Sequence, residues 1–167
     1  MEKPFAAQGR ELPPHHFEEI YERNVNTLYR VCFSYMKNAA DTEDAVADVF
    51  VKLLKSGKTF QSIEHEKAWL LRTAINRCKD YLKHWWRKRA DIDDYDIAAP
   101  GNLPEIDEIL ESVLELPERY KAVIYLYYYE GYSSAEIASI LNKPQSTILN
   151  HLSEARKYLK GVLENEE

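Results

Sequence analysis

Helical periodicity of apolar residues runs through almost the whole chain of 167 residues. Apolar side chains recur every three or four residues in segment after segment, and no alternation of apolar and polar residues lasts for more than a few positions. Because this spacing places the apolar side chains on one face of a helix, each segment can bury that face against its neighbours. The pattern therefore predicts an all-α fold.

Three amphipathic segments in the first half of the chain are predicted helices. Pro13 and Pro14 precede the first, which runs from about residue 15 to 37. Residues 38–41 break the pattern, and a second helix covers about residues 42–55. A loop over residues 57–66 leads to a third helix over residues 67–89. The predicted core face of the second helix holds Ala45, Val46, Val49, Phe50, Leu53 and Leu54.

The segment at residues 67–89 carries an apolar face and a basic face. At about 100° per residue, four polar side chains point within about 60° of one another around the helix axis. The apolar side chains point to a separate face of the helix. Residues 72–89 hold seven Lys or Arg against the single Asp80, in a chain of net charge −6. This local reversal of charge indicates a contact surface for nucleic-acid phosphates, although a solvated surface helix would show a similar stripe. The polar set is Arg72, Asn76, Lys79 and Lys83, and the apolar set is Leu71, Ile75, Cys78 and Leu82.

The three tryptophans, Trp69, Trp85 and Trp86, lie on the same predicted helix. Aromatic side chains can stack on unpaired bases, a contact worth roughly 1–3 kcal/mol per base. The alternative is packing in the protein core, and we favour it for at least one of the three.

An acidic segment divides the chain. Residues 91–115 contain nine acidic residues and no basic one, and Pro100, Gly101 and Pro104 interrupt any helix there. Residues 1–90 hold 16 basic and 12 acidic residues, a balance of +4, and the remainder holds 6 and 16, a balance of −10. We therefore predict an N-terminal tail over residues 1–12, a helical domain over 13–90, an acidic flexible linker over 91–105 and a second helical domain over 106–167.

The second domain contains a predicted helix-turn-helix. Ser133 and Glu136 have the spacing of a capping box ahead of a helix over residues 134–141. A turn over residues 142–144 and a helix over about residues 146–163 follow. Asn142 stands where such turns often place Gly, and Asn tolerates the left-handed conformation. Helices paired in this way are typical of DNA binding, although ordinary bundles contain them as well.

Motifs for catalysis, cofactors or metals are missing from the sequence. The five histidines are scattered, and there is no Gly-rich phosphate loop, GxSxG or HExxH motif. Cys32 and Cys78 lie on apolar faces without CxxC spacing, which predicts buried reduced thiols. We expect no enzymatic activity, no cofactor, no metal and no small-molecule substrate. The chain has no run of 18 apolar residues and no signal peptide, which predicts a cytoplasmic protein.

Three blocks of sequence together resemble bacterial RNA polymerase sigma factors of the extracytoplasmic-function (ECF, group 4) type. DAVADVFVKLL (residues 44–54) looks like region 2.2, KAWLLRTAINRCKDYLK (67–83) like regions 2.3 and 2.4, and residues 116–159 like region 4. The resemblance covers roughly residues 17–163. It implies a region 2 helical bundle, a region 4 helix-turn-helix, and a dissociable subunit that binds core RNA polymerase and directs promoter recognition, −10 melting and transcription initiation.

The resemblance also implies the partners and the residues that contact them. The first domain would face the polymerase β′ clamp and the −10 element, and the second would face the β flap and the −35 element. The loop over residues 57–66 would help to pocket a flipped base. An anti-sigma factor would cover the polymerase-binding surfaces. The implied core-polymerase residues are Asp44, Asp48, Val49 and Lys52, the −10 residues are Arg72, Asn76, Arg77, Lys79 and Lys83, and the −35 residues are Gln145, Ser146, Thr147, Asn150, His151, Arg156 and Lys157.

The sequence departs from the family pattern in its recognition helix. Where the family usually reads close to TVKSRLSRAR, this chain has TILNHLSEAR, so Leu149, His151 and Glu154 stand at commonly basic positions. Fewer phosphate contacts weaken binding and flatten its salt dependence. We therefore expect the basic helix of the first domain to supply most of the electrostatic attraction to DNA. Ala47 and Asp48 replace a common Gln-Glu pair, and we expect core binding to survive this change.

Two other functions are compatible with parts of the sequence. A stand-alone helix-turn-helix repressor would use the second domain alone, and a polymerase-sequestering protein would bind core without initiating transcription.

A further hypothesis concerns the acidic segment at residues 91–115. Its carboxylates could occupy a positively charged polymerase channel in place of nucleic-acid phosphates, or the segment could stay solvated.

Overall fold

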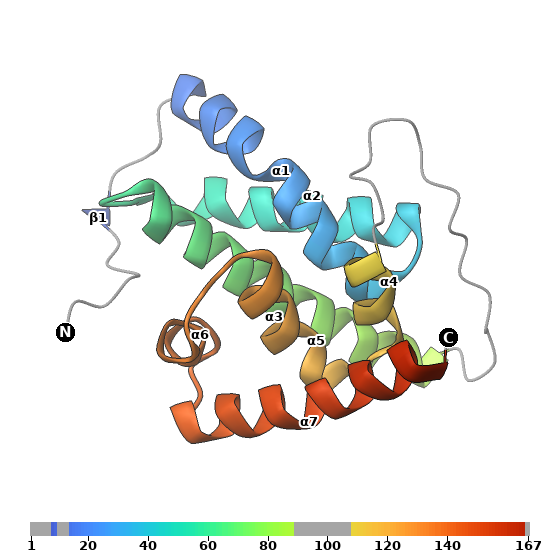
Figure 1. Ribbon diagram of the computed structural model, residues 1–167. Helices are drawn as coiled ribbons and strands as arrows, with labels where there is room; N and C mark the ends of the chain where they lie inside the picture. The colour runs from blue at the N-terminus through green and yellow to red at the C-terminus, as the bar shows by residue number, and fades with distance from the viewer. Residues whose placement is uncertain (1–7, 10–13, 89–107, 166–167) are drawn as a thin grey trace. The chain divides into compact units, whose positions relative to one another are not determined.

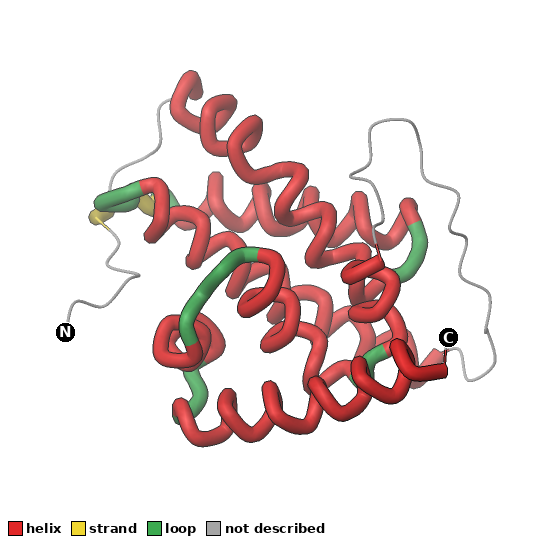
Figure 2. The backbone as a smooth tube through the Cα atoms, in the orientation of Figure 1, coloured by secondary structure: helices red, strands yellow, loops and turns green. Residues whose placement is uncertain are grey.

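The computed structural model describes residues 8–9, 14–88 and 108–165, which are almost entirely helical (Figures 1 and 2). The chain divides into two compact units, Met1–Pro104 and Glu105–Glu167. The all-α fold with two small helical domains is confirmed. The acidic linker predicted over residues 91–105, and the predicted tail apart from residues 8–9, lie outside the described residues.

The described part of the first unit contains α1 (Pro14–Met36), α2 (Ala39–Ser56) and α3 (Ile63–Lys88), each packed against the other two. Figure 1 shows α1 in blue, α2 in cyan and α3 in green. Their apolar stripes meet in one core, because burial of these side chains is the main stabilising contribution available to three amphipathic helices. The core includes Leu28, Val31, Cys32, Leu53, Leu71, Ile75 and Cys78, all essentially inaccessible to solvent.

Two helices begin earlier than the periodicity predicts. α2 starts at Ala39 because the side chain of Asn38 accepts a hydrogen bond from the Asp41 backbone N–H at 2.8 Å. α3 starts at Ile63, and the Ser62 hydroxyl accepts a hydrogen bond from the His65 N–H at 3.1 Å. The loop predicted over residues 57–66 therefore covers only residues 57–62.

The connection between α2 and α3 begins with a left-handed glycine and contains a short strand. Gly57 has a φ of 62°, which ends α2 without the steric cost that a side chain would add. The following residues form β2 (Lys58–Thr59), which pairs antiparallel with β1 (Gln8–Gly9). This two-residue ladder was not predicted, because it is too short to show an alternating pattern.

A buried carboxylate connects α1 to the first turn of α3. Glu66 is 5% exposed, and its carboxylate accepts hydrogen bonds from the Arg23 guanidinium at 3.1–3.2 Å and from the Asn24 amide at 2.9 Å. The bond to Glu66 raises the pKa of Arg23 above its ordinary value. A buried charge is tolerated only when it is paired in this way. The contact fixes the end of the residue 57–62 loop against α1.

The second unit contains α4 (Glu108–Glu115), α5 (Glu118–Ile124), the π-helical turn η1 (Tyr125–Tyr129), α6 (Ser134–Leu141) and α7 (Gln145–Asn165). α7 packs on both α5 and α6. The π-helical turn was not predicted. It buries Tyr125 and stacks its ring on that of Tyr129 at 5.1 Å.

The predicted helix-turn-helix is present in the second unit. The Ser133 hydroxyl accepts from the Glu136 N–H at 3.1 Å, and the Glu136 carboxylate accepts from the Ser133 N–H at 3.0 Å, so the capping box is complete. Asn142 ends α6 with a φ of 54°, as its tolerance of the left-handed conformation predicts. These local signals position α7 relative to α6.

Cys32 and Cys78 are free and fully buried in the first unit, which confirms the prediction of buried reduced thiols. A hydrogen bond between the two side chains and the burial of both raise the pKa of Cys32 well above its ordinary value.

Among the residues that the structure describes, none of the helices combines the length and apolar character needed to cross a membrane. Within the same residues, no cluster of His, Cys, Asp or Glu side chains is arranged to hold a metal ion.

The contact between Glu66 and α1 predicts a stability difference between two neighbouring glutamates. Replacing Glu66 with Ala should lower the free energy of unfolding of the first domain by about 2 kcal/mol, because Arg23 and Asn24 lose their shared acceptor. Glu64→Ala on the exposed side of the same turn should change it by less than about 0.5 kcal/mol. All three tryptophans belong to this unit, so their fluorescence in urea reports its unfolding. Equal changes in the free energy of unfolding for both variants would contradict the structural role assigned to Glu66.

Candidate nucleic-acid and polymerase interfaces

α3 separates an apolar face from a basic one. Leu71, Ile75 and Cys78 are buried against α1 and α2, and Leu82 is half-buried. Asn76 and Lys83 are exposed on the other side of the helix, while Arg72 and Lys79 are half-buried. The predicted apolar face is confirmed, and contact of the four polar residues with DNA stays a prediction. Cations exposed along one side of a helix form a surface that suits a phosphate backbone.

Arg77 lies apart from the basic face and pairs with α2. Its Nε donates to the Asp48 carboxylate at 2.7 Å, and its guanidinium lies 5.7 Å from the centre of the Tyr81 ring. The Tyr81 hydroxyl donates in turn to Asp41 at 2.7 Å. Arg77 and Asp48 were assigned to different partners, but the structure brings them into contact. No pattern in the sequence indicates this pairing, because the two residues are 29 positions apart.

The exposed face of α2 combines acidic, basic and apolar side chains. Asp44, Asp48 and Lys52 are exposed, as their assignment to a polymerase contact requires. Val51 and Leu54 are exposed on the same helix, although Leu54 was predicted to lie in the core. The sequence VFVKLL holds apolar residues on more than one face, so periodicity alone does not separate these positions.

The assignment of Val49 to the polymerase contact is wrong. Its side chain is 1% exposed and belongs to the core of the first unit. A side chain enclosed by its own helices offers no area to a partner. Val51 and Leu54 are the apolar side chains that α2 offers instead.

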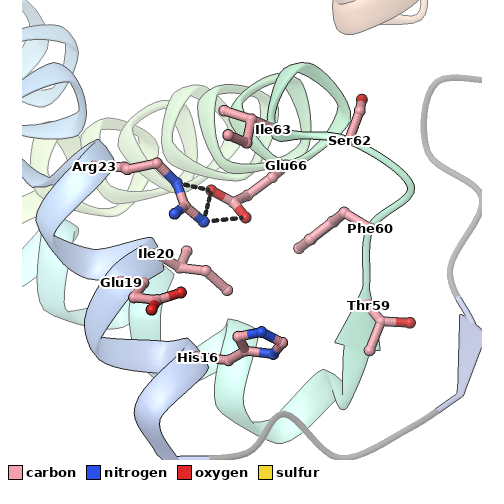
Figure 3. A pocket seen from close by; sticks show the side chains of 9 residues that line it. All are labelled: His16, Glu19, Ile20, Arg23, Thr59, Phe60, Ser62, Ile63 and Glu66. Carbon is pink, nitrogen blue, oxygen red and sulfur yellow. Dashed lines mark hydrogen bonds and ion pairs between the residues drawn. The ribbon is translucent and has the colours of Figure 1, made fainter.

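A cavity of about 270 Å³ lies beside the residue 57–62 loop (Figure 3). Its lining comes from α1, from the loop including Phe60, and from the first turn of α3 (Figure 3). The Arg23–Glu66 ion pair lies at this cavity. Figure 3 shows the Phe60 ring on the loop side, opposite His16 and Ile20 of α1.

Trp69 supports the loop from the core side. It is buried, its ring lies 5.8 Å from that of Phe60, and the Lys58 ammonium lies 5.1 Å from its ring centre. Core packing is therefore confirmed for one of the three tryptophans. The side chains of Trp85 and Trp86 lie outside the described residues.

The exposed face of α7 is neutral at its start and basic further along. Gln145, Ser146 and Asn150 are exposed near the N-terminus, and Thr147 is half-buried. Arg156 and Lys157 are exposed two turns later. The Gln145 amide donates to the Ser134 hydroxyl at 3.0 Å, which joins the first turns of α6 and α7.

Several charged or ionisable side chains of α7 contact other groups of the protein. The His151 ring lies 5.5 Å from that of Tyr120 in an edge-to-face arrangement, so this predicted DNA contact is half-buried against α5. The Lys157 ammonium pairs with Glu154 at 3.2 Å. Arg156 donates to the Tyr128 hydroxyl at 3.0 Å, which raises the pKa of Arg156. Sequence spacing indicates the Glu154–Lys157 pair, but not the two tyrosine contacts.

Comparison with known proteins identifies the family. The family model for sigma-70 region 2 matches residues 20–88, and that for sigma-70 region 4 matches residues 106–159. The RNA polymerase sigma factor SigV of Bacillus subtilis is 30% identical over 143 residues, which cover 84% of this chain and 86% of SigV. The ECF sigma factor SigM of the same organism is 27% identical, covering 87% and 93%. The chain belongs to the ECF group of the sigma-70 family of RNA polymerase sigma factors, which bind polymerase and direct it to promoters.

Two solved structures share the fold. The sigma factor RpoE from Bartonella quintana, solved in complex with the anti-sigma factor NepR, matches with a TM-score of 0.71 at 19% identity. The match covers 90% of this chain and 98% of RpoE. CnrH, solved with the cytosolic domain of CnrY, matches with a TM-score of 0.65 at 18% identity, covering 93% and 92%. Of the functions considered from the sequence, neither the repressor nor the sequestering protein is favoured by the family models and the similar sigma factors.

The Asp48–Arg77 contact predicts a weak energetic coupling. A double-mutant cycle of Asp48→Ala and Arg77→Ala should give a coupling below about 1 kcal/mol, because both side chains are more than a third exposed and solvent screens the pair. Urea unfolding followed by tryptophan fluorescence measures it, and the coupling should fall further in high salt. A coupling of several kcal/mol would show that the pair is a major structural contact.

Proposed function

We propose that three exposed helix faces of this sigma factor each bind a different partner. The face of α2 binds core polymerase, that of α3 contacts the −10 element, and that of α7 contacts the −35 element. The proposed core contacts are Asp44, Asp48, Lys52, Val51 and Leu54, the −10 contacts are Arg72, Asn76, Lys79 and Lys83 with Arg77 at their edge, and the −35 contacts are Gln145, Ser146, Thr147, Asn150, Arg156 and Lys157 with His151 behind them.

The arrangement of α3 carries the −10 assignment. Its apolar side chains are buried in the core, and Asn76 and Lys83 on its polar side are exposed to solvent. That side gathers cations in a protein whose net charge is −6, which favours a polyanion over a neutral or acidic partner. The amide of Asn76 adds a group that can hydrogen-bond to bases or to the sugar-phosphate backbone.

The mixed face of α2 supports the polymerase assignment. Protein interfaces bury apolar side chains in a rim of polar ones, and Val51 and Leu54 lie among Asp44, Asp48 and Lys52 on this face. The relatives RpoE and CnrH were solved with NepR and CnrY, the first of which is an anti-sigma factor. We propose that an anti-sigma factor of this protein covers the same α2 face, and that the second domain contacts the β flap.

The loop over residues 57–62 is proposed to hold a base that leaves the duplex during −10 melting. Flipped bases need a new pocket and aromatic contacts to offset the lost stacking. The cavity beside Phe60 and the support of the loop by Trp69 and Glu66 favour this role. A rigid loop loses less conformational entropy on binding than a mobile one.

The protein acts in the cytoplasm, where core polymerase and promoter DNA are found, and it has no catalysis of its own.

The acidic segment over residues 91–115 occupies a positively charged polymerase channel. Replacing Asp91, Asp93, Asp94 and Asp96 with Asn should then weaken core binding or change the yield of abortive transcripts, and unchanged values for both would contradict this proposal.

Run-off transcription with core polymerase tests the division between α2 and α3. Asn76→Ala and Lys79→Ala should each lower promoter opening about tenfold and leave core affinity unchanged. Asp48→Ala should lower core affinity about tenfold, because an interface charge is lost at little cost to the fold. The matched control is Asn26→Ala, which removes an exposed amide from α1 and should change neither quantity.

Two outcomes would contradict the proposal. Loss of core binding in Asn76→Ala and Lys79→Ala would show that the interfaces are placed wrongly. Core binding without any promoter-dependent transcript from the unmodified protein would favour a sequestering function.

A further inference from the structure

α7 exposes a leucine in the middle of the face that is proposed to meet DNA. Leu149 is 52% exposed, and its helical neighbours Ser146, Asn150 and Ser153 are exposed with it. At about 100° per residue, the exposed side chains of residues 145–157 span an arc of about 140°, and Leu149 lies within about 30° of its centre. Ile148, Leu152 and Ala155 are buried on the opposite side of the helix. Packing therefore holds the leucine in an outward orientation.

The part of α7 around Leu149 carries no formal charge. Residues 145–153 include no Lys, Arg, Asp or Glu, and His151 packs against Tyr120. The cations Arg156, Lys157 and Lys160 lie further along the same face. In helix-turn-helix proteins the N-terminal residues of the second helix contact base edges. The base-reading part of this helix therefore lacks the Arg or Lys that usually reads guanine.

Among the described residues of the second unit, Leu149 differs from the other exposed large apolar side chains. Tyr128 accepts a hydrogen bond from Arg156, and the Tyr158 ring contacts that of Tyr120 at 5.6 Å. Both tyrosines thus contribute to packing within the unit. Leu149 instead presents more than half of its surface to solvent beside two serines and an asparagine.

We propose that Leu149 is a specificity-determining residue that contacts the methyl group of a thymine in the −35 element. Of the four standard bases, thymine is the one that presents a methyl group in the major groove. Asn150, next to Leu149, can pair bidentately with N6 and N7 of an adjacent adenine. The inference rests on the proposed −35 role of α7 and specifies its base preference: an A·T pair whose thymine faces Leu149.

Deoxyuridine substitution tests the methyl contact directly, because uracil pairs like thymine and lacks only the methyl group. Holoenzyme, formed from the full chain and core polymerase, first selects a −35 element from randomised promoter DNA. Each thymine of that element is then replaced by uracil in turn. One replacement should weaken binding of the unmodified holoenzyme about fourfold, as expected for one lost apolar group.

Variants of Leu149 assign the effect to this side chain. Leu149→Ala should bind the thymine promoter about fourfold more weakly and should no longer distinguish thymine from uracil. Leu149→Met keeps an extended apolar side chain and should retain the difference. Because Leu149 is exposed, neither change should impair folding, which circular dichroism of the free protein can check.

Two failures can be distinguished. If replacing the whole −35 element leaves holoenzyme affinity unchanged, the proposed −35 role of α7 is wrong. If that replacement weakens binding but uracil has no effect at any position, or if Leu149→Ala still distinguishes thymine from uracil, the −35 role stands and the methyl contact is overturned.

Discussion

The packing of α3 between α1 and α2 is the constraint on which the rest of the first domain depends. Burial of Leu71, Ile75 and Cys78 fixes the rotation of α3 about its axis. With that rotation fixed, Asn76 and Lys83 are exposed on the opposite side and Arg77 is directed toward Asp48 of α2. The basic surface is thus a consequence of core packing, and the contact of Glu66 with Arg23 holds the first turn of the same helix.

The two domains present charge to DNA in different ways. On α3 the exposed Lys83 stands apart from the Asp48–Arg77 pair, so its charge is available for phosphates. On α7, Lys157 pairs with Glu154 and Arg156 bonds to Tyr128, while the start of the helix is neutral. The first domain is therefore suited to electrostatic attraction, and the second to reading bases through neutral side chains once polymerase holds it in place.

Sequence reasoning recovered the features that depend on local chemistry. The helices, the Ser133–Glu136 capping box, the left-handed Asn142 and the buried face of α3 follow from periodicity and turn preferences. Asn38 and Ser62 are residue types that favour helix N-caps, so the earlier starts of α2 and α3 also follow from local chemistry. Val49 was misassigned because α2 holds apolar residues on several faces. The contacts of Glu66 and Arg77 join distant positions, which one sequence does not reveal.

We propose that α3 supplies the electrostatic attraction to DNA and that α7 reads the bases. The most direct test of this account is the salt dependence of promoter binding by holoenzyme. Each phosphate contact contributes about 0.9 to the slope of log K against log salt concentration. Lys83→Ala on α3 should flatten the slope by about that amount. Lys157→Ala on α7 should flatten it much less, since Glu154 already pairs with this lysine. A larger effect from Lys157 than from Lys83 would show that the recognition helix, and not α3, supplies the electrostatic attraction.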